Sequence, residues 1–336
     1  MHQFSNTLEG TSDRLQPSRQ SAVDGLRGIA ALLVAVAHLG ASGAWHPWNG
    51  VSGLGVFGVG IFFVISGYIV PETMTASGYA LPSYFRQIGR RLARLHPPYL
   101  VTLGLIVGLR SFSAALPGYQ GEQFYVEAER LLSHLPLLSQ VLGYAWYSPV
   151  FWTLAFELQF YLLIGLILPL LTNKSATVRL VAFAALTGLA ALRVNEAWLP
   201  MHLTPFLLGI MVFMARRGLM GRWAITLFAV VVLYGASSIY TVANLLVVAA
   251  AAILIIRQVS WQPLSMLGMV SYSLYLTHPL VFGYLRRLLG RMGGSIDTHL
   301  MSIMTISVAI LVAFLFHRLV ESPSVRLAKR IKVAVD

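Results

Sequence analysis

The chain contains the stretch LRGIAALLVAVAHL at residues 26–39, which is apolar apart from Arg27 and His38. With its small and apolar neighbours, this stretch predicts a membrane-spanning helix over about 25–44. Arg27 and His38 are eleven positions apart, which at ~100° and ~1.5 Å per residue puts them on one helix face about 16 Å apart. Because hydrocarbon solvates such groups poorly, we expect both to be sheltered by protein or water. Arg27 as an interfacial anchor and His38 as an interhelical hydrogen-bond partner also fit this pattern.

The composition of the chain is that of a membrane protein. Of its 336 residues, 57% are hydrophobic and 11% are charged, and the mean hydropathy is +0.72. A soluble globular domain is far more polar. There is no cysteine, which excludes disulfides, thiolate metal sites and a cysteine acyl-enzyme, and we expect no metal cofactor. Residues 1–24 are polar and lack the pattern of a secretory signal, so we expect the first helix to be retained.

Ten segments are apolar enough to be interpreted as membrane helices, each of which needs about 20 residues to cross the bilayer. The apolar run over 222–256 is too long for one helix, so we divide it at Gly235-Ala236-Ser237-Ser238, where glycine and small polar residues favour a break. We therefore predict an all-α polytopic membrane protein with about ten transmembrane helices, at 25–44, 54–72, 97–112, 149–171, 178–194, 200–216, 222–237, 239–256, 263–285 and 298–319.

The distribution of basic residues predicts the orientation. With a cytoplasmic N-terminus most Lys and Arg residues fall inside, as the positive-inside rule describes, so we expect both termini in the cytoplasm. The net charge of +12 then reflects topology and attraction to anionic membrane lipid. Since the basic residues are dispersed among the spans, no nucleic-acid partner is expected. The six that fall outside are Arg110, Arg130, Arg193, Arg286, Arg287 and Arg291.

This topology divides the chain into three parts. We expect a polar cytoplasmic tail over 1–24, a transmembrane domain over 25–320 and a basic cytoplasmic tail over 321–336. The longest segment between spans, at about 113–148, is expected to form an ordered extracytoplasmic loop.

Two further ionisable residues fall within predicted spans. Glu157 lies about 12 Å from the outer end of its span, and His278 lies about 22 Å from the cytoplasmic end of its own. Ionisable groups at such depth often mark functional sites. The pattern also fits Glu157 as a protonated structural acid, and His278 as a cap for a carbonyl freed where Pro279 disturbs the helix. The aromatic residues near Glu157 are interpreted as interfacial and packing residues: Trp152, Phe156, Phe160 and Tyr161.

The second span, GLGVFGVGIFFVISGY at 53–68, is rich in glycine. Small residues at these spacings favour close helix packing, and a backbone-lined groove for a thin flexible chain is the functional alternative. The next segment, RQIGRRLARLHPPY at 86–99, places arginines at a cytoplasmic helix entrance. They satisfy the positive-inside rule and also suit a bidentate grip on the phosphates of a cytoplasmic ligand: Arg86, Arg90, Arg91 and Arg94.

Taken together, six motifs resemble the membrane acyltransferase-3 family. They are DGLRGIA at 24–30 followed by His38, GIFFVISGY at 60–68, RRLARLHPPY at 90–99, WTLAFELQFY at 152–161, SYSLYLTH at 271–278 and ESP at 321–323. They occur in family order over nearly the whole chain. The resemblance implies an integral protein of the bacterial inner membrane that transfers an acyl group, usually acetyl, from cytoplasmic acyl-CoA to a hydroxyl, often of an exopolysaccharide, lipopolysaccharide or similar glycan. It also implies that Arg27 and His38 are functionally required.

The resemblance and the residue chemistry together give a hypothesis for the site. The four arginines would hold the phosphates of the acetyl-CoA donor, and its pantetheine arm would follow the glycine-rich span, where we assign Ser66 and Tyr68 to donor binding. His38 would act as general base, and Arg27 would position the donor. Glu157 would orient His38 or bind the acceptor, and His278 would hold the developing oxyanion.

Several alternatives stay open at this stage. One departure from the family is that Glu157 is followed by Leu158, where relatives more often have two adjacent acidic residues. A transporter would also place Arg, His and Glu within the membrane, although we find no paired halves of the kind common in transporters. A non-catalytic scaffold would explain the glycines and aromatic residues but leaves Arg27, His38 and Glu157 unexplained. The acceptor could be a small lipophilic glycoside instead of a glycan. The acyl group, the choice between direct transfer and an acyl-histidine intermediate, and a homo-oligomeric state are not determined by the sequence.

Overall fold

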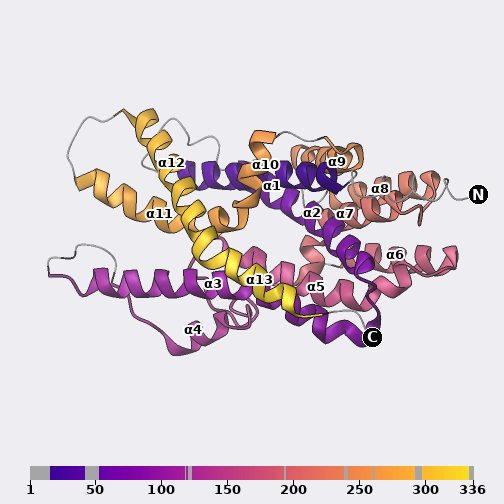
Figure 1. Cartoon of the computed structure of the whole chain (residues 1–336), viewed down its shortest axis with the longest axis horizontal. Coiled ribbons are helices and arrows are strands. Elements are labelled where there is room, and N and C mark those ends of the chain that lie inside the picture. Colours follow the sequence, from indigo (N-terminus) through magenta and orange to yellow (C-terminus); the bar gives the residue numbers. More distant parts are fainter. Residues whose placement is uncertain are drawn as a thin grey trace, which may run out of the picture.

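The computed structural model describes residues 16–41, 53–117, 119, 123–192, 194–237, 241–259, 262–291 and 297–332. Within these ranges the chain is helical and has no strand. Its helices are α1 (Gln16–Ala41), α2 (Leu54–Ala76), α3 (Tyr84–Ala114), α4 (Ala128–His134), α5 (Phe151–Leu171), α6 (Ala176–Ala190), α7 (Leu203–Arg216), α8 (Arg222–Ala236), α9 (Val242–Arg257), α10 (Gln262–Met269), α11 (Ser271–Arg291), α12 (Thr298–Phe316) and α13 (Ser322–Arg330) (Figure 1).

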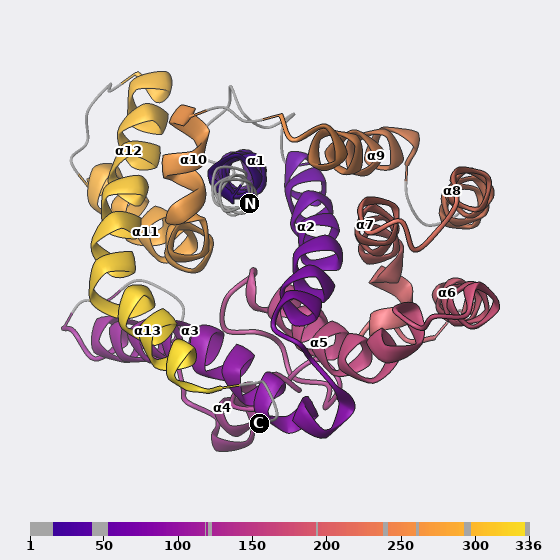
Figure 2. The same cartoon turned by 45° about the vertical axis from the view of Figure 1, so that its right-hand side comes forward.

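Helix α1 runs through the middle of this assembly and is seen nearly end-on in Figure 2. It packs against α2 on one side and against α10 and α11 on the other. Because α1 is surrounded by other helices, side chains on several of its faces point into the protein. Arg27 and His38 are therefore held inside the bundle, at successive levels along one helix.

Helices α2 and α7 cross at two glycines. A Cβ atom at Gly67 would overlap with the backbone of Phe206, and one at Gly209 would overlap with the backbone of Val64 and of Gly67. Only glycine permits so close an approach. The packing interpretation of the glycine-rich span is therefore confirmed at this crossing.

Six helical segments of the described chain are long and apolar enough to cross a membrane: Ala22–Leu39, Leu54–Ala76, Leu81–Ala114, Phe151–Leu171, Leu199–Arg216 and His299–Arg330. Three of the other predicted spans coincide with shorter apolar helices, Ala176–Ala190, Arg222–Ala236 and Val242–Arg257. The predicted break in the run 222–256 is confirmed, since α8 ends at Ala236 and α9 begins at Val242. The described helices fit an integral membrane protein, while the number of ten spans and the orientation stay predictions.

One predicted helix boundary was wrong because proline was given too much weight. Helix α3 begins at Tyr84 and continues through Pro97 and Pro98, so the third span starts well before residue 97. The predicted span 263–285 is divided between two helices, since α10 ends at Met269 and α11 begins at Ser271 and continues through Pro279. The ring of His278 donates from Nδ1 to the carbonyl of Leu274, 2.9 Å away, in the turn before the proline.

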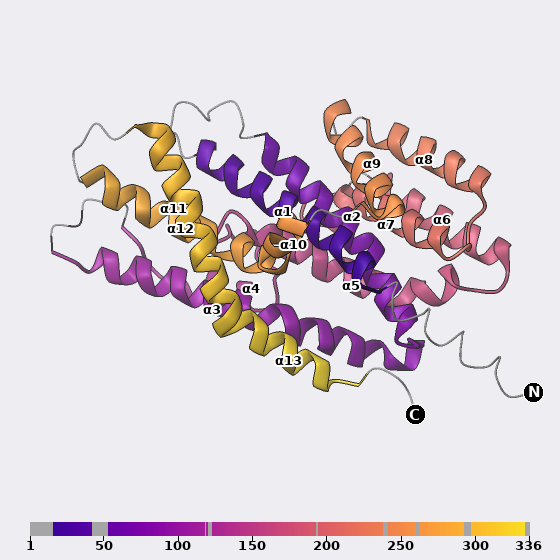
Figure 3. The same cartoon turned by 45° about the horizontal axis from the view of Figure 1, so that its top comes forward.

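The predicted tails contain helical structure. Helix α1 begins at Gln16, before the expected start of the membrane domain. Residues 321–336 were predicted to form a tail, but they begin with α13, which packs along α3 (Figure 3). Ser324 and Ala328, one turn apart, are buried in this contact, whereas Lys329 and Arg330 are exposed. The basic residues of this short amphipathic helix give its sequence the composition of a polar tail, so the helix was not predicted.

The segment predicted as an ordered loop, about 113–148, contains α4 and several turns built around His134. The side chain of His134 is fully buried. Its Nδ1 lies 2.8 Å from the carbonyl of Arg130, and its Nε2 accepts a hydrogen bond from the backbone N–H of Tyr147 at 3.0 Å. The buried ring thus replaces regular secondary structure in satisfying these backbone groups. Residues 118 and 120–122 of this segment lie outside the described residues.

Candidate active site

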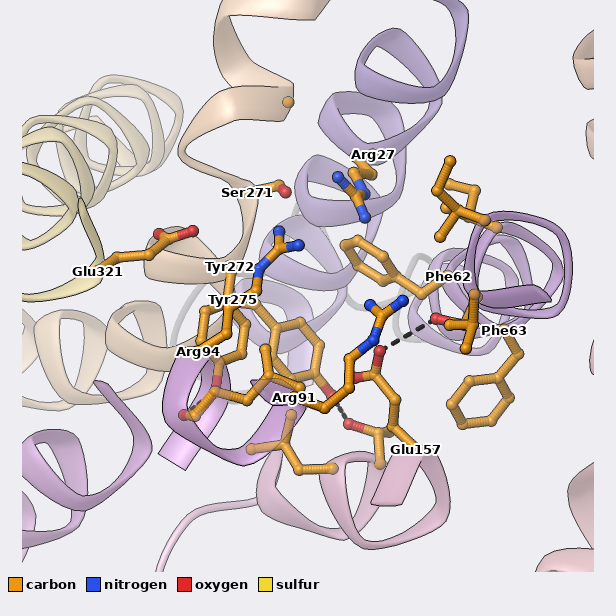
Figure 4. Close-up of a pocket in the computed structure, with 18 of the residues that line it drawn as sticks. Arg27, Phe62, Phe63, Arg91, Arg94, Glu157, Ser271, Tyr272, Tyr275 and Glu321 are labelled. Atoms are coloured by element: carbon orange, nitrogen blue, oxygen red, sulfur yellow. Dashed lines mark hydrogen bonds between the residues drawn. The ribbon is translucent and has the colours of Figure 1, made fainter. Parts of the chain in front are cut away.

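A cavity of about 350 Å³ lies where α1, α2, α3, α5 and α11 meet, and we call it the Glu157 cavity (Figure 4). The guanidinium groups of Arg27, Arg91 and Arg94 converge on this space. They come from two helices, α1 and α3, that are far apart in the sequence. Such a cluster presents many N–H donors in one place and suits a ligand with anionic oxygens.

The carboxylates of this cavity are engaged with protein groups. Asp24 lies 3.6 Å from Arg27 in an ion pair one turn apart on α1. Glu157 accepts hydrogen bonds from Ser66 Oγ, at 3.1 Å, and from the hydroxyl of Tyr161. A carboxylate in the bundle interior needs partners of this kind, which here come from α2 and α5.

Two of the arginines differ in how firmly they are held. Arg91 donates to Thr73 Oγ1 at 2.8 Å and lies over the ring of Tyr161, with 5.3 Å from its guanidinium carbon to the ring centroid. Arg94 forms no hydrogen bond or ion pair with any residue that the structure describes. Its N–H donors are therefore available to a ligand, whereas Arg91 is already oriented.

Glu321 completes the far wall of the Glu157 cavity. It ends a π-helical turn, His317–Glu321, between α12 and α13. Its carboxylate accepts a hydrogen bond from Ser273 at 2.6 Å and lies 3.0 Å from His317 Nδ1. The wider π turn directs Glu321 into the bundle, which is a common use of π-bulges at functional sites.

His38 and His278 lie side by side. The Nδ1 atom of His38 is 2.9 Å from the carbonyl of Val34 and 3.3 Å from Nε2 of His278. A carbonyl only accepts, so Nδ1 of His38 carries the hydrogen, and Nδ1 of His278 carries one toward Leu274 for the same reason. In two neutral rings, Nε2 of His278 then accepts from His38, and Nε2 of His38 keeps its lone pair for a ligand.

His38 borders two further cavities. The Trp152 cavity, of about 380 Å³, is lined by His38, Trp152, His202 and Tyr275 among others. The Arg287 cavity, of about 240 Å³, is lined by His38 and by residues of α3, α11 and the segment before α5. His38 is therefore accessible to ligands from two sides and is not enclosed by packing.

The three cavities are neighbours in a row. Val59, Phe63 and Tyr275 line both the Glu157 cavity and the Trp152 cavity. His38 and Pro149 line both the Trp152 cavity and the Arg287 cavity. Tyr275 thus stands between the arginine cluster and His38. Its hydroxyl is fixed by Thr153 Oγ1 at 2.6 Å and by the carbonyl of Val150 at 3.0 Å.

The predicted site residues divide between these places. Arg27 and Glu157 share one cavity, while His38 and His278 lie beyond Tyr275, so the expectation that Glu157 orients His38 is wrong. His278, fully buried, contacts His38 instead, and its Nδ1–H is directed to the carbonyl of Leu274 and not to an oxyanion. Arg27 and His38 do share a helix face, but three turns of separation open them to different cavities. The lining of the Glu157 cavity includes Arg91, Arg94 and Ser66 but not Arg86, Arg90 or Tyr68.

Several residues of the site were missed. Trp152 was interpreted as packing, but it lines the cavity beside His38, whereas Phe156 and Phe160 are buried in the core as expected. A second histidine, His202, also lines that cavity, and its ring centroid lies 4.0 Å from that of Phe156. Tyr272 and Tyr275 also line the Glu157 cavity and were missed, although their spacing of three positions puts them on one face of a helix.

Known proteins resemble this chain over most of its length. A family model described as an acyltransferase domain, Acyl_transf_3, matches residues 20–318. The chain is 30% identical over 302 residues to BcsY of Komagataeibacter xylinus, named a membrane-bound transacylase, covering 80% of this chain and 74% of the relative. It is 26% identical over 368 aligned positions to the acyltransferase MdmB of Streptomyces mycarofaciens, covering 93% of each chain. No solved structure gives a significant match. The chain therefore belongs to the acyltransferase-3 family of membrane acyltransferases.

Proposed function

We propose that this acyltransferase moves an acetyl group from acetyl-CoA to a hydroxyl of a glycan such as an exopolysaccharide or lipopolysaccharide, in the bacterial inner membrane. The observation that supports this most directly is the position of His38. It lies between a cavity that leads past Tyr275 to a cluster of arginines and a cavity that opens on its other side. A base between two compartments suits a reaction in which donor and acceptor arrive from opposite faces.

The donor is assigned to the Glu157 cavity, on the cytoplasmic side of the predicted topology. Arg94, with its donors available, and Arg91, already oriented by Thr73, suit the phosphates of coenzyme A. Arg86 and Arg90 lie nearer the start of α3 and would meet phosphates that extend beyond the cavity. Arg27 points into the same space and would orient the donor without transferring protons, because a guanidinium does not titrate in this range.

The pantetheine arm would extend from the arginines along α2 toward the Trp152 cavity. Val59 and Phe63 line both cavities, and Gly60 lines the second, so one apolar helix face connects them. An apolar path suits the thin, uncharged arm, while the polar ends are held at either side. We therefore keep the groove interpretation of the glycine-rich span near Gly60, while Gly67 serves helix packing.

The chemical step follows from the assigned hydrogens. The acceptor hydroxyl gives its proton to Nε2 of His38 while its oxygen attacks the thioester carbonyl carbon. The imidazolium that forms donates from Nδ1 to Nε2 of His278 and to the Val34 carbonyl, which orient it and stabilise its charge. The C–S bond then breaks and the proton passes to the departing thiolate. The products are an ester and free coenzyme A, and His38 is neutral again.

The test supplies radiolabelled acetyl-CoA to the outside of inverted membrane vesicles that were formed in the presence of a crude glycan fraction, so that the glycan is enclosed in their lumen. The parent protein is compared with His38→Ala and with His299→Ala, a matched control at an exposed histidine of α12. We expect labelled glycan from the parent and from the control, and a loss of about 10²- to 10⁴-fold in His38→Ala. Equal labelling by His38→Ala would remove His38 from the mechanism. No label with the parent would overturn acetyl-CoA as donor or glycan as acceptor.

A second measurement separates direct transfer from an acyl-enzyme. In vesicles without glycan, direct transfer leaves no label on the purified protein. Label that stays on the parent and is absent from His38→Ala would replace the proposed step with an acyl-histidine intermediate.

A further inference from the structure

The Arg287 cavity is bordered by arginines that are themselves exposed at the protein surface. Three arginines border it, Arg110 from α3 and Arg286 and Arg287 from α11, and no aspartate or glutamate is among its described lining residues. These three are half of the six basic residues that the predicted topology places on the outer side, against the general bias. Two of these arginines, Arg110 and Arg287, have no acidic partner within the described residues, and positive charge of this kind beside His38 indicates a ligand of opposite charge.

Arg110 and Arg287 are free to bind such a ligand. Arg110 lies over the ring of Phe124 at 5.6 Å, and Arg287 lies over the ring of Tyr284 at 5.9 Å. Neither forms a hydrogen bond or ion pair within the described ranges. An aromatic ring occupies only the face of a guanidinium, so the N–H donors at its edge remain available for a bidentate carboxylate or phosphate.

A second, independent observation comes from two buried hydroxyls. Tyr147 and Ser148 line the same cavity and are 3% and 2% exposed. The hydroxyl oxygens of both are buried and have no hydrogen-bond partner in the described chain. Buried polar atoms without partners are rare in folded proteins and indicate a ligand that supplies them. The hydroxyl groups of a sugar are neutral and can form hydrogen bonds with both of these protein hydroxyls.

We infer that the Arg287 cavity is the acceptor subsite and that it takes an anionic sugar residue. Its carboxylate or phosphate group would bind Arg110 and Arg287, while its hydroxyls would bind Tyr147 and Ser148. The volume of about 240 Å³ equals that of about eight water molecules at ~30 Å³ each, which leaves room for one sugar ring. His38 lines the same cavity, so a hydroxyl of the bound ring is presented to the base.

This inference rests on the proposed function and makes it more specific. It replaces glycans in general by glycans that carry acidic residues. A neutral lipophilic glycoside would leave the arginines without a counter-charge. The other anion available at this position is the headgroup of an acidic phospholipid, which would use the arginines but would leave the two buried hydroxyls unexplained.

The test measures sugar binding directly, without donor. Purified full-length protein in phosphatidylcholine nanodiscs is titrated with trigalacturonate and with galactotriose, its uncharged counterpart, by calorimetry. We expect trigalacturonate to bind at least tenfold more tightly. Arg110→Gln and Arg287→Gln should each remove most of this difference, and Arg287→Lys should restore part of it. Tyr147→Phe and Ser148→Ala should weaken both sugars by a similar factor of about two to ten.

Coenzyme A binding to the same samples is the control for folding, since the Glu157 cavity is separate from these residues. Equal affinity of the parent for both sugars, or a difference that persists in both glutamine variants, would overturn the inference. So would a loss of trigalacturonate binding in phosphatidylglycerol nanodiscs together with phosphatidylglycerol that copurifies with the parent but not with Arg287→Gln. That result would assign the arginines to lipid.

The binding test and the transfer test can fail separately. Charge-dependent sugar binding without acetyl transfer to trigalacturonate supports the cavity assignment and counts against the proposed donor. Acetyl transfer to neutral and acidic glycans at equal rates, with equal affinities, supports the proposed function and overturns the anionic subsite.

Discussion

The Nε2 atom of His278 lies 3.3 Å from Nδ1 of His38, although 240 positions separate the two residues in the chain. The contact joins α1 to α11 at the level where two cavities meet. It assigns the hydrogen of His38 to Nδ1 and leaves Nε2 as the only nitrogen that can accept a proton from a ligand. In the proposed mechanism His278 therefore acts through His38 and does not contact the reacting atoms.

Replacing His278 should lower the rate and leave donor binding unchanged. We expect His278→Ala to reduce kcat by about 10- to 100-fold, because the imidazolium of His38 loses a charge-assisted hydrogen bond. The KM for acetyl-CoA should stay the same, since the arginines lie in the Glu157 cavity. His278→Gln, which keeps an acceptor oxygen, should recover part of kcat. A variant that loses activity only through a raised KM would contradict the orienting role.

The arginines of the Glu157 cavity should show the opposite pattern. Arg94→Gln is expected to raise the KM for acetyl-CoA by about 10- to 100-fold with a smaller change in kcat, because a guanidinium-to-phosphate interaction is charge-assisted. Arg86→Gln should have a smaller effect, since Arg86 is exposed and does not line the cavity. Arg330→Gln, at an exposed position of α13, serves as control. Initial rates over a range of acetyl-CoA concentrations give both constants. Equal effects at Arg94 and Arg330 would argue against the assignment.

The sequence predicted well what depends on one helix at a time. Apolar runs located the helices, and Ser237 with its small neighbours located the break between α8 and α9. The rule that ionisable residues deep in a span mark functional sites selected Glu157, His38 and His278. Glu157 and His38 each line a cavity, and His278 contacts His38. These inferences need only the helical period and the cost of burying polar groups in lipid.

What depends on contacts between helices was not predictable. The spacing of Arg27 and His38 gives their common face, but not that Tyr275 of α11 separates the cavities that they line. His278 was assigned to the oxyanion because nothing in its own helix shows that it faces His38. Arg287 was counted only as a topological exception, since its cavity also needs α3 and the segment before α5.

The loop built around His134 should lose stability in acid. Burial, and to a smaller extent the charge of Arg130, lower the pKa of His134 below its usual value of about 6.5. The folded state therefore favours the neutral ring, whose Nε2 accepts from Tyr147. Its contribution is fully present above the unfolded pKa and is lost as the pH falls through the lower folded pKa.

The measurement is the thermal midpoint of the detergent-purified protein between pH 7.5 and pH 5. The parent should unfold at progressively lower temperature below about pH 6.5. His134→Asn should be less stable than the parent at pH 7.5 but should lose less on acidification. Because other histidines also titrate, the difference between the two proteins is the informative quantity. Parallel curves for parent and variant would exclude His134 as the acid-sensitive group.

The glycine crossing of α2 and α7 should tolerate no side chain. In Gly209→Ala the new Cβ would meet the backbone of Val64 and Gly67, which belongs to a neighbouring helix and cannot rotate away. The helices must separate, and we expect a loss of about 1–3 kcal/mol, as for overpacked cores. Gly104→Ala, in the interior of α3, is the matched control, because a Cβ there meets nothing within 4 Å. It should stabilise the protein by about 0.5–1 kcal/mol, since alanine favours helix more than glycine does. The thermal midpoints of the two variants in detergent should therefore move in opposite directions, and an unchanged or raised midpoint for Gly209→Ala would show that the crossing is looser than these contacts require.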